Sequence, residues 1–173
     1  MATLVLTVIG DDRSGLVSAL SGVVTDNGGS WERSHMARLA GKFAGIVVVA
    51  VPDARVQQLL ADLAPLQEQG LLEIRAEQGD DTSSGGEVIR LSLALVGADR
   101  PGIVHAISRA LAASGVGIEE LQTATREAPM AGGMLFEATA TLLVPPGTSA
   151  DELRPMLEEI ADELMVDLAL SGD

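Results

Sequence analysis

The stretch Ile9-Gly10-Asp11-Asp12-Arg13-Ser14-Gly15-Leu16-Val17 returns later in the chain as Val96-Gly97-Ala98-Asp99-Arg100-Pro101-Gly102-Ile103-Val104. Adding 87 to each residue number of the first stretch gives its counterpart in the second. The same spacing continues beyond the motif, because Gly28 matches Gly115 and Ala37 matches Ala124. A repeat of this length is too long for a solenoid unit and indicates two copies of a small domain.

The spacing changes once. Phe43 matches Phe136 and Val51-Pro52 matches Val144-Pro145, now 93 residues apart. The second copy therefore carries six extra residues, around Arg126 to Gly133.

The composition of the 173-residue chain is that of a folded protein, with 47% hydrophobic and 21% charged residues. The chain has no cysteine, which excludes disulfides, thiolate nucleophiles and zinc–sulfur sites. Its formal charge of −14, with only 11 basic residues, argues against direct binding to nucleic acid, which needs clustered Lys and Arg. No apolar run approaches the roughly 20 residues of a membrane span. We therefore expect a cytoplasmic protein that binds neither nucleic acid nor membrane.

Each half is predicted to run strand, helix, strand, strand, helix, strand. Apolar residues alternate or cluster in the predicted strands and recur at helical spacing between them. The predicted organisation is a first domain over 1–78, a small polar linker over 79–87 and a second domain over 88–173. This order predicts an α+β fold of two tandem ferredoxin-like βαββαβ domains, each with a four-stranded antiparallel sheet and helices on one face. Pro155 predicts that the last helix starts a residue or two after its possible capping box at Ser149.

The repeated motif joins the first strand of each half to the first helix. Backbone N–H groups at a helix start favour an anion such as a carboxylate, and a glycine there lets a ligand come close. An equally weighted alternative is a structural turn, with the aspartate as helix cap and proline at the first helical position. Arg13 and Arg100 either add positive charge or pair with the aspartate beside them.

With this motif, the helix-ending glycines Gly28 and Gly115 and the element order, the chain resembles the ACT-domain family of ligand-sensing modules. As a pair without an attached enzyme, it is similar to the glycine cleavage system transcriptional repressor group. The resemblance implies a regulatory protein that senses an amino acid or similar small carboxylate and acts through a protein partner, in transcriptional control of amino-acid or glycine metabolism. It also implies a homo-oligomer. The implied ligand-binding residues are Asp12, Arg13, Ser14, Gly15, Leu16, Asp99, Arg100, Pro101, Gly102 and Ile103.

Other functions have less support. His35 and His105 are accompanied by no tight group of carboxylates, so neither a metal site nor a catalytic site is expected. No cofactor is expected, and the chain is not expected to be an enzyme. An RNA-binding module of the same element order would need aromatic residues on its sheet, and the aromatic content is 2%. The main alternative is a structural or oligomerisation module without a ligand.

Overall fold

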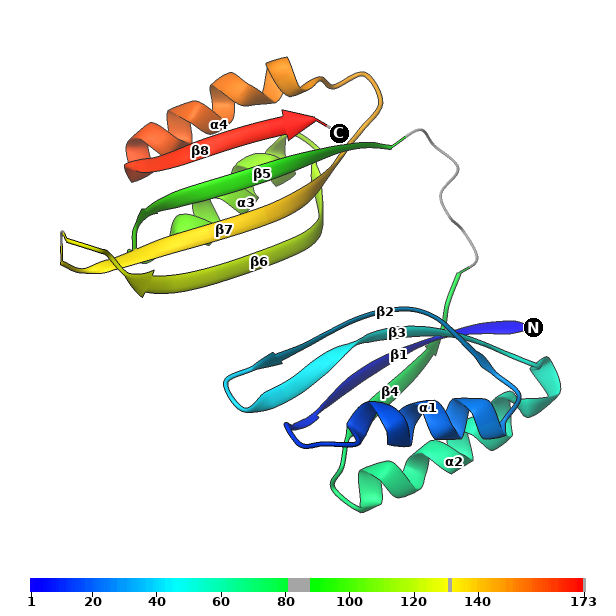
Figure 1. Cartoon of the computed structure of the whole chain (residues 1–173). Helices are drawn as coiled ribbons and strands as arrows, with labels where there is room; N and C mark the ends of the chain where they lie inside the picture. The colour runs from blue at the N-terminus through cyan, green and yellow to red at the C-terminus, as the bar shows by residue number, and fades with distance from the viewer. Residues whose placement is uncertain (81–87, 131, 173) are drawn as a thin grey trace. The chain divides into compact units, whose positions relative to one another are not determined.

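The computed structural model describes residues 1–80, 88–130 and 132–172, and the chain divides into two compact units, Met1–Ser84 and Gly85–Asp173 (Figure 1). Residues 81–87, most of the expected linker over 79–87, lie outside the described residues. Gly79 still belongs to the first unit through a hydrogen bond from its N–H to the carbonyl of Thr3 (2.9 Å). The domain limits at 78 and 88 stay predictions.

Both units have the predicted order of elements. The first consists of β1 (Ala2–Asp11), α1 (Leu16–Asp26), β2 (Ser30–Leu39), β3 (Lys42–Val51), a 3-10 turn (Asp53–Arg55), α2 (Val56–Glu68) and β4 (Glu73–Gln78). The second consists of β5 (Ile89–Ala98), α3 (Ile103–Ala113), β6 (Gly117–Glu127), β7 (Met134–Val144), α4 (Ala150–Leu164) and β8 (Val166–Gly172). The strands form two antiparallel four-stranded sheets, ordered β2-β3-β1-β4 and β6-β7-β5-β8. The predicted tandem ferredoxin-like fold is confirmed.

Each sheet is covered on one face by the two helices of its own unit (Figure 1). Along β1 every second residue is buried against the helices, and α1 contributes apolar side chains at a spacing of four. In the first unit the members of this core include Leu4, Leu6, Val8, Leu16, Leu20 and Val24. Each such side chain contributes about 1.5–3 kcal/mol when it is fully removed from water. The second unit repeats the arrangement with its own core.

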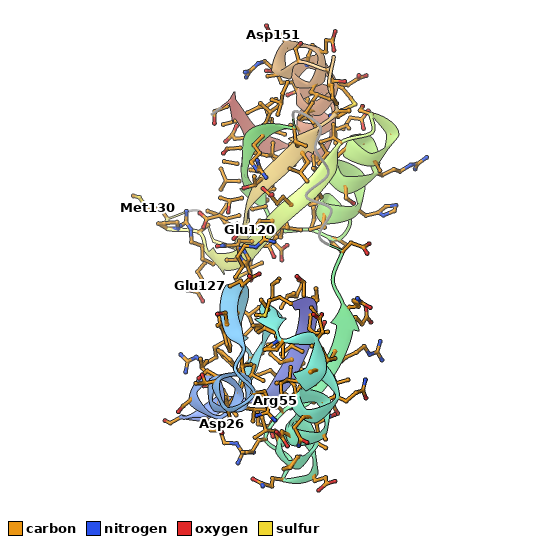
Figure 2. The ribbon with its side chains drawn as sticks, turned by 90° about the vertical axis from the view of Figure 1, so that its right-hand side faces the viewer. Asp26, Arg55, Glu120, Glu127, Met130 and Asp151 are labelled. Atoms are coloured by element: carbon orange, nitrogen blue, oxygen red, sulfur yellow. The ribbon has the colours of Figure 1, made fainter. Side chains whose placement is uncertain are left out.

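The residue pairs between neighbouring strands show the same two offsets, 87 and 93, as the repeat in the sequence. Leu6 pairs with Val47 on β3, and Leu93 pairs with Ala140 on β7, so the offset is 87 on one strand and 93 on the other. Two residues separate β2 from β3 and six residues separate β6 from β7, so four of the six extra residues lengthen this turn. The other two lengthen β6 and β7 by one residue each. Figure 2 shows Met130, which is fully exposed, at the tip of this hairpin and pointing away from the sheet.

Helix starts differ from expectation in the second unit. The expected start of α3 at Pro101 is wrong by two residues, because Gly102 precedes the helix in a left-handed conformation. The expected late start of α4 is also wrong: Ser149 caps the helix and forms a complete capping box with Glu152, and Pro155 lies inside. A proline at this point removes one backbone hydrogen bond, and the two capping bonds offset the loss.

Candidate functional site

The repeated loops place a glycine immediately before each first helix. Gly15 has φ 91° and ψ 0°, and Gly102 has φ 96° and ψ −3°, so both lie in the left-handed region that glycine adopts readily. A Cβ atom built on either glycine would meet no atom within 4 Å. The backbone angle, rather than crowding within the unit, therefore favours glycine at these two positions.

Neither of these helix starts has a side-chain cap among the described residues. The interpretation of Asp12 and Asp99 as helix caps is wrong, because the glycine three residues later occupies the capping position. Acidic residues are also lacking in the first turn of α1 and of α3. The positive end of each helix dipole thus faces the loop without a compensating carboxylate from its own helix.

Each aspartate instead fixes its loop to the neighbouring hairpin. The N–H of Asp12 donates to the carbonyl of Gly41 (2.9 Å), and the N–H of Asp99 donates to the carbonyl of Met134 (2.8 Å). These two bonds are related by the repeat, with offsets of 87 and 93. The end of the first strand is therefore held in the same way in both units.

The two motif arginines do not pair with their neighbouring aspartates. Arg13 donates from Nη2 to the carbonyl of Gly70 (2.8 Å), and Arg100 donates from Nη2 to the carbonyl of Glu163 (3.2 Å). Both acceptors lie at the carboxyl end of the second helix of the unit, where a positive charge is favoured. Nε of Arg100 is buried and has no hydrogen-bond partner within the described part of the chain. The arginines therefore connect each loop to the end of the second helix.

The electrostatic surroundings of the two loops differ. In the first unit Lys42 forms an ion pair with Asp11, and Arg38 approaches Asp12 at 3.4 Å. The hydrogen bond and charge of Lys42 lower the pKa of the Asp11 carboxyl group. Sequence reasoning missed both basic residues, although the pairing of Asp11 with Lys42 across the hairpin follows from its register.

The repeat places uncharged residues at the corresponding positions of the second unit. Thr125 stands where Arg38 stands, Leu135 where Lys42 stands, and Ala98 where Asp11 stands. Asp99 is exposed, and no ion pair involves it among residues 1–80, 88–130 and 132–172. Its carboxylate is therefore available to a cation from outside the unit.

Within each unit, the expected ligand residues lie together on one loop. Leu16 and Ile103 are buried, so they can offer a ligand their backbone N–H groups but not their side chains. The expected residues from Asp12 to Gly15, together with Asp99, Pro101 and Gly102, are exposed. Both loops therefore present backbone donors at a surface.

The two histidines do not belong to either loop. His35 is exposed on β2 and His105 is exposed on α3. Within the described ranges, no group of three or more His, Cys, Asp or Glu residues is arranged to hold a metal ion. None of the helices that the structure describes is long and apolar enough to cross a membrane.

Comparisons with known proteins agree with the observed fold. A family model described as the ACT domain matches residues 2–77 and again residues 90–171. An unknown protein from Galdieria sulphuraria has a structure similar to this chain, with 30% identity, a TM-score of 0.83 and coverage of 99% of this chain and 98% of that one. A candidate glycine cleavage system transcriptional repressor is similar in fold, with 17% identity, a TM-score of 0.75 and coverage of 99% and 97%. No curated protein matches the chain.

Proposed function

We propose that this chain, which belongs to the ACT-domain family, is a regulatory protein that senses a small amino acid. The observation that carries the proposal is that α1 and α3, which begin directly after Gly15 and Gly102, have no side-chain cap. A carboxylate placed there accepts hydrogen bonds from backbone N–H groups and interacts favourably with the helix dipole. The proposed ligand residues are those of the loops Asp12–Leu16 and Asp99–Ile103.

A regulatory rather than catalytic role agrees with the chemistry of these loops. They present backbone donors and two arginines that are occupied by main-chain carbonyls. A catalyst would need a nucleophile with a base or a metal with ligands. We therefore propose that ligand binding changes the association of this protein with another protein.

We propose a protein as the partner, because the formal charge of −14 argues against nucleic acid. Such a charge repels the phosphates of nucleic acid. If the protein controls transcription, as the similarity to a candidate repressor suggests, it does so through a DNA-binding partner. Ligand-dependent association, including association into a homo-oligomer, is the form of regulation that we propose.

A thermal-shift screen of the purified full chain against the common amino acids tests the proposal. A ligand that binds only the folded state stabilises it by about 2.7 kcal/mol at a hundredfold excess over its Kd. We expect at least one small amino acid to raise the melting temperature, and isothermal titration calorimetry then gives its affinity. The same amino acid should lose affinity when its carboxylate is replaced by an amide. If no amino acid shifts the transition, the chain is a structural module and the proposal is wrong.

A further inference from the structure

Asn27, at the end of α1, is the only asparagine of the chain, and a glycine follows it. An asparagine loses its side-chain amide most readily before glycine, because glycine has no Cβ to hinder attack by its backbone nitrogen. No aspartate of the chain is followed by glycine, so the related rearrangement of aspartate is not favoured elsewhere. The sequence therefore concentrates this chemistry at one residue.

The side chain of Asn27 connects the two helices of the first unit, α1 and α2, which lie side by side (Figure 1). It is 2% exposed, and its Nδ2 donates to the carbonyl of Val23 (3.0 Å) and to Oδ2 of Asp62 (2.9 Å). Oδ1 of Asp62 accepts a further hydrogen bond from Gln58 (2.7 Å). The contact between the helices therefore depends on the NH₂ group of Asn27 as a donor to a carboxylate.

The folded backbone prevents Asn27 and Gly28 from reacting with each other. The ψ of Asn27 is 11°, so the nitrogen of Gly28 nearly eclipses the backbone nitrogen of Asn27 and lies away from its Cβ. The Gly28 N–H also donates to the carbonyl of Thr25 (2.9 Å). Ring closure needs this nitrogen unbound and beside the side chain. The end of α1 must therefore open before Asn27 can react.

We propose that Asn27 is a modification site, at which opening of the end of α1 allows spontaneous loss of the side-chain amide. The backbone nitrogen of Gly28 gives its proton to solvent and forms a bond to Cγ of Asn27. The amide nitrogen takes up a proton and leaves as ammonia. Water, the co-reactant, then opens the resulting five-membered ring and leaves aspartate or isoaspartate at position 27.

The modified chain cannot restore the contact between α1 and α2. An oxygen replaces Nδ2, so at neutral pH a carboxylate at position 27 faces the carboxylate of Asp62 and the carbonyl of Val23 without a hydrogen between them. A buried charge without a partner is strongly unfavourable, and more so at the carboxyl end of a helix dipole. Modification therefore converts a transient opening into a lasting weakening of the first unit.

The second unit has no such site at the corresponding position. Ser114 stands there before Gly115, and its hydroxyl contacts Sδ of Met156 on α4 (3.1 Å). Serine has no amide to lose. The two units therefore differ in their susceptibility, and Asn27→Ser, which introduces the residue of the second unit, is the matched control.

Mass spectrometry of the full chain, incubated at mildly alkaline pH with and without denaturing urea, tests the reaction. In urea, we expect the peptide that contains Asn27 to gain the mass of an amide-to-acid change. The folded chain should react at least about tenfold more slowly, because the opening of α1 costs free energy. Asn27→Ser should show no gain in either condition. Equal rates in the folded and unfolded chain, or no reaction in urea, would overturn the proposal.

Asn27→Asp reproduces the aspartate product and tests its consequence. Urea unfolding is followed by the fluorescence of Trp31, which packs against the core of the first unit. We expect the ratio of folded to unfolded chain to be at least about tenfold lower in Asn27→Asp than in Asn27→Ser. Asn27→Asp/Asp62→Asn exchanges donor and acceptor, so it should recover part of this loss, and it remains measurable if the single variant does not fold. Equal stability of Asn27→Asp and Asn27→Ser, or no recovery in the double variant, would show that modification does not break this contact.

Discussion

Replacing Gly15 with alanine should destabilise the first unit without creating a clash. Gly15 has φ 91°, and an added Cβ would meet no atom within 4 Å. The whole effect is therefore backbone strain, which is about 1–2 kcal/mol for a side chain in a left-handed conformation. Gly22, inside α1, is the matched control, because its Cβ would also meet open space and its φ is not positive. There alanine should stabilise the helix by roughly 0.5–1 kcal/mol.

Urea unfolding followed by tryptophan fluorescence measures this difference. The chain has a single tryptophan, Trp31, which packs against the core of the first unit and so reports on that unit. We expect the free energies of unfolding of Gly15→Ala and Gly22→Ala to differ by about 2 kcal/mol. Gly102 lies in the second unit, so Gly102→Ala should not change the urea midpoint measured by Trp31 fluorescence. It should lower the stability of the second unit, measured by circular dichroism. If Gly15→Ala is as stable as Gly22→Ala, the left-handed start of the helix is not the reason for glycine.

Three further substitutions test features of the fold. Ser149→Ala removes the capping box of α4 and should lower the free energy of unfolding by about 0.5–2 kcal/mol, measured by circular dichroism in urea. Gly45→Ala would bring a Cβ within 2.3 Å of the carbonyl oxygen of His35, so it should destabilise the first unit by about 1–3 kcal/mol in the fluorescence assay. Hydrogen bonds to the carboxylate of Asp62, chiefly from Asn27, lower the pKa of Asp62 in the folded protein. The ionised carboxylate therefore stabilises the fold above the unfolded pKa of about 3.8, and this stabilisation is lost as the pH falls through the lower folded pKa. Asp62→Asn should flatten the pH dependence of unfolding in this acidic range.

The repeat made most of the fold predictable from sequence. Two copies with the same spacing required the same order of elements, and the change from 87 to 93 located the longer hairpin turn. The alternation of Leu4, Leu6 and Val8 identified the buried face of the first strand. These patterns depend on local periodicity, which a single sequence displays directly.

The candidate site was less predictable because its contacts are remote in sequence. Arg13 reaches Gly70, 57 residues away, and nothing in the motif indicates that acceptor. The motif alone leaves an aspartate cap as an open alternative, whereas Gly15 occupies the cap position with a backbone angle that propensity alone does not reveal. Pro155 alone predicts a later start of the helix, but the capping bonds of Ser149 offset its missing N–H. In these cases, sequence patterns over a few neighbouring residues do not reveal the contact between distant residues, the backbone angle or the capping bond that determines the local structure.

The arginine bond that links each loop to the end of the second helix limits how strongly a bound molecule can act through it. A hydrogen bond of this kind contributes about 1 kcal/mol net, which is roughly a fivefold change in an equilibrium constant. Moving a population from 1:99 to 99:1 takes about 5.5 kcal/mol. Breaking the bonds of Arg13 and Arg100 together supplies less than half of that amount. A ligand acting through these two bonds alone would shift the equilibrium between two conformations by about 25-fold, far short of the roughly 10⁴-fold change that a complete switch requires.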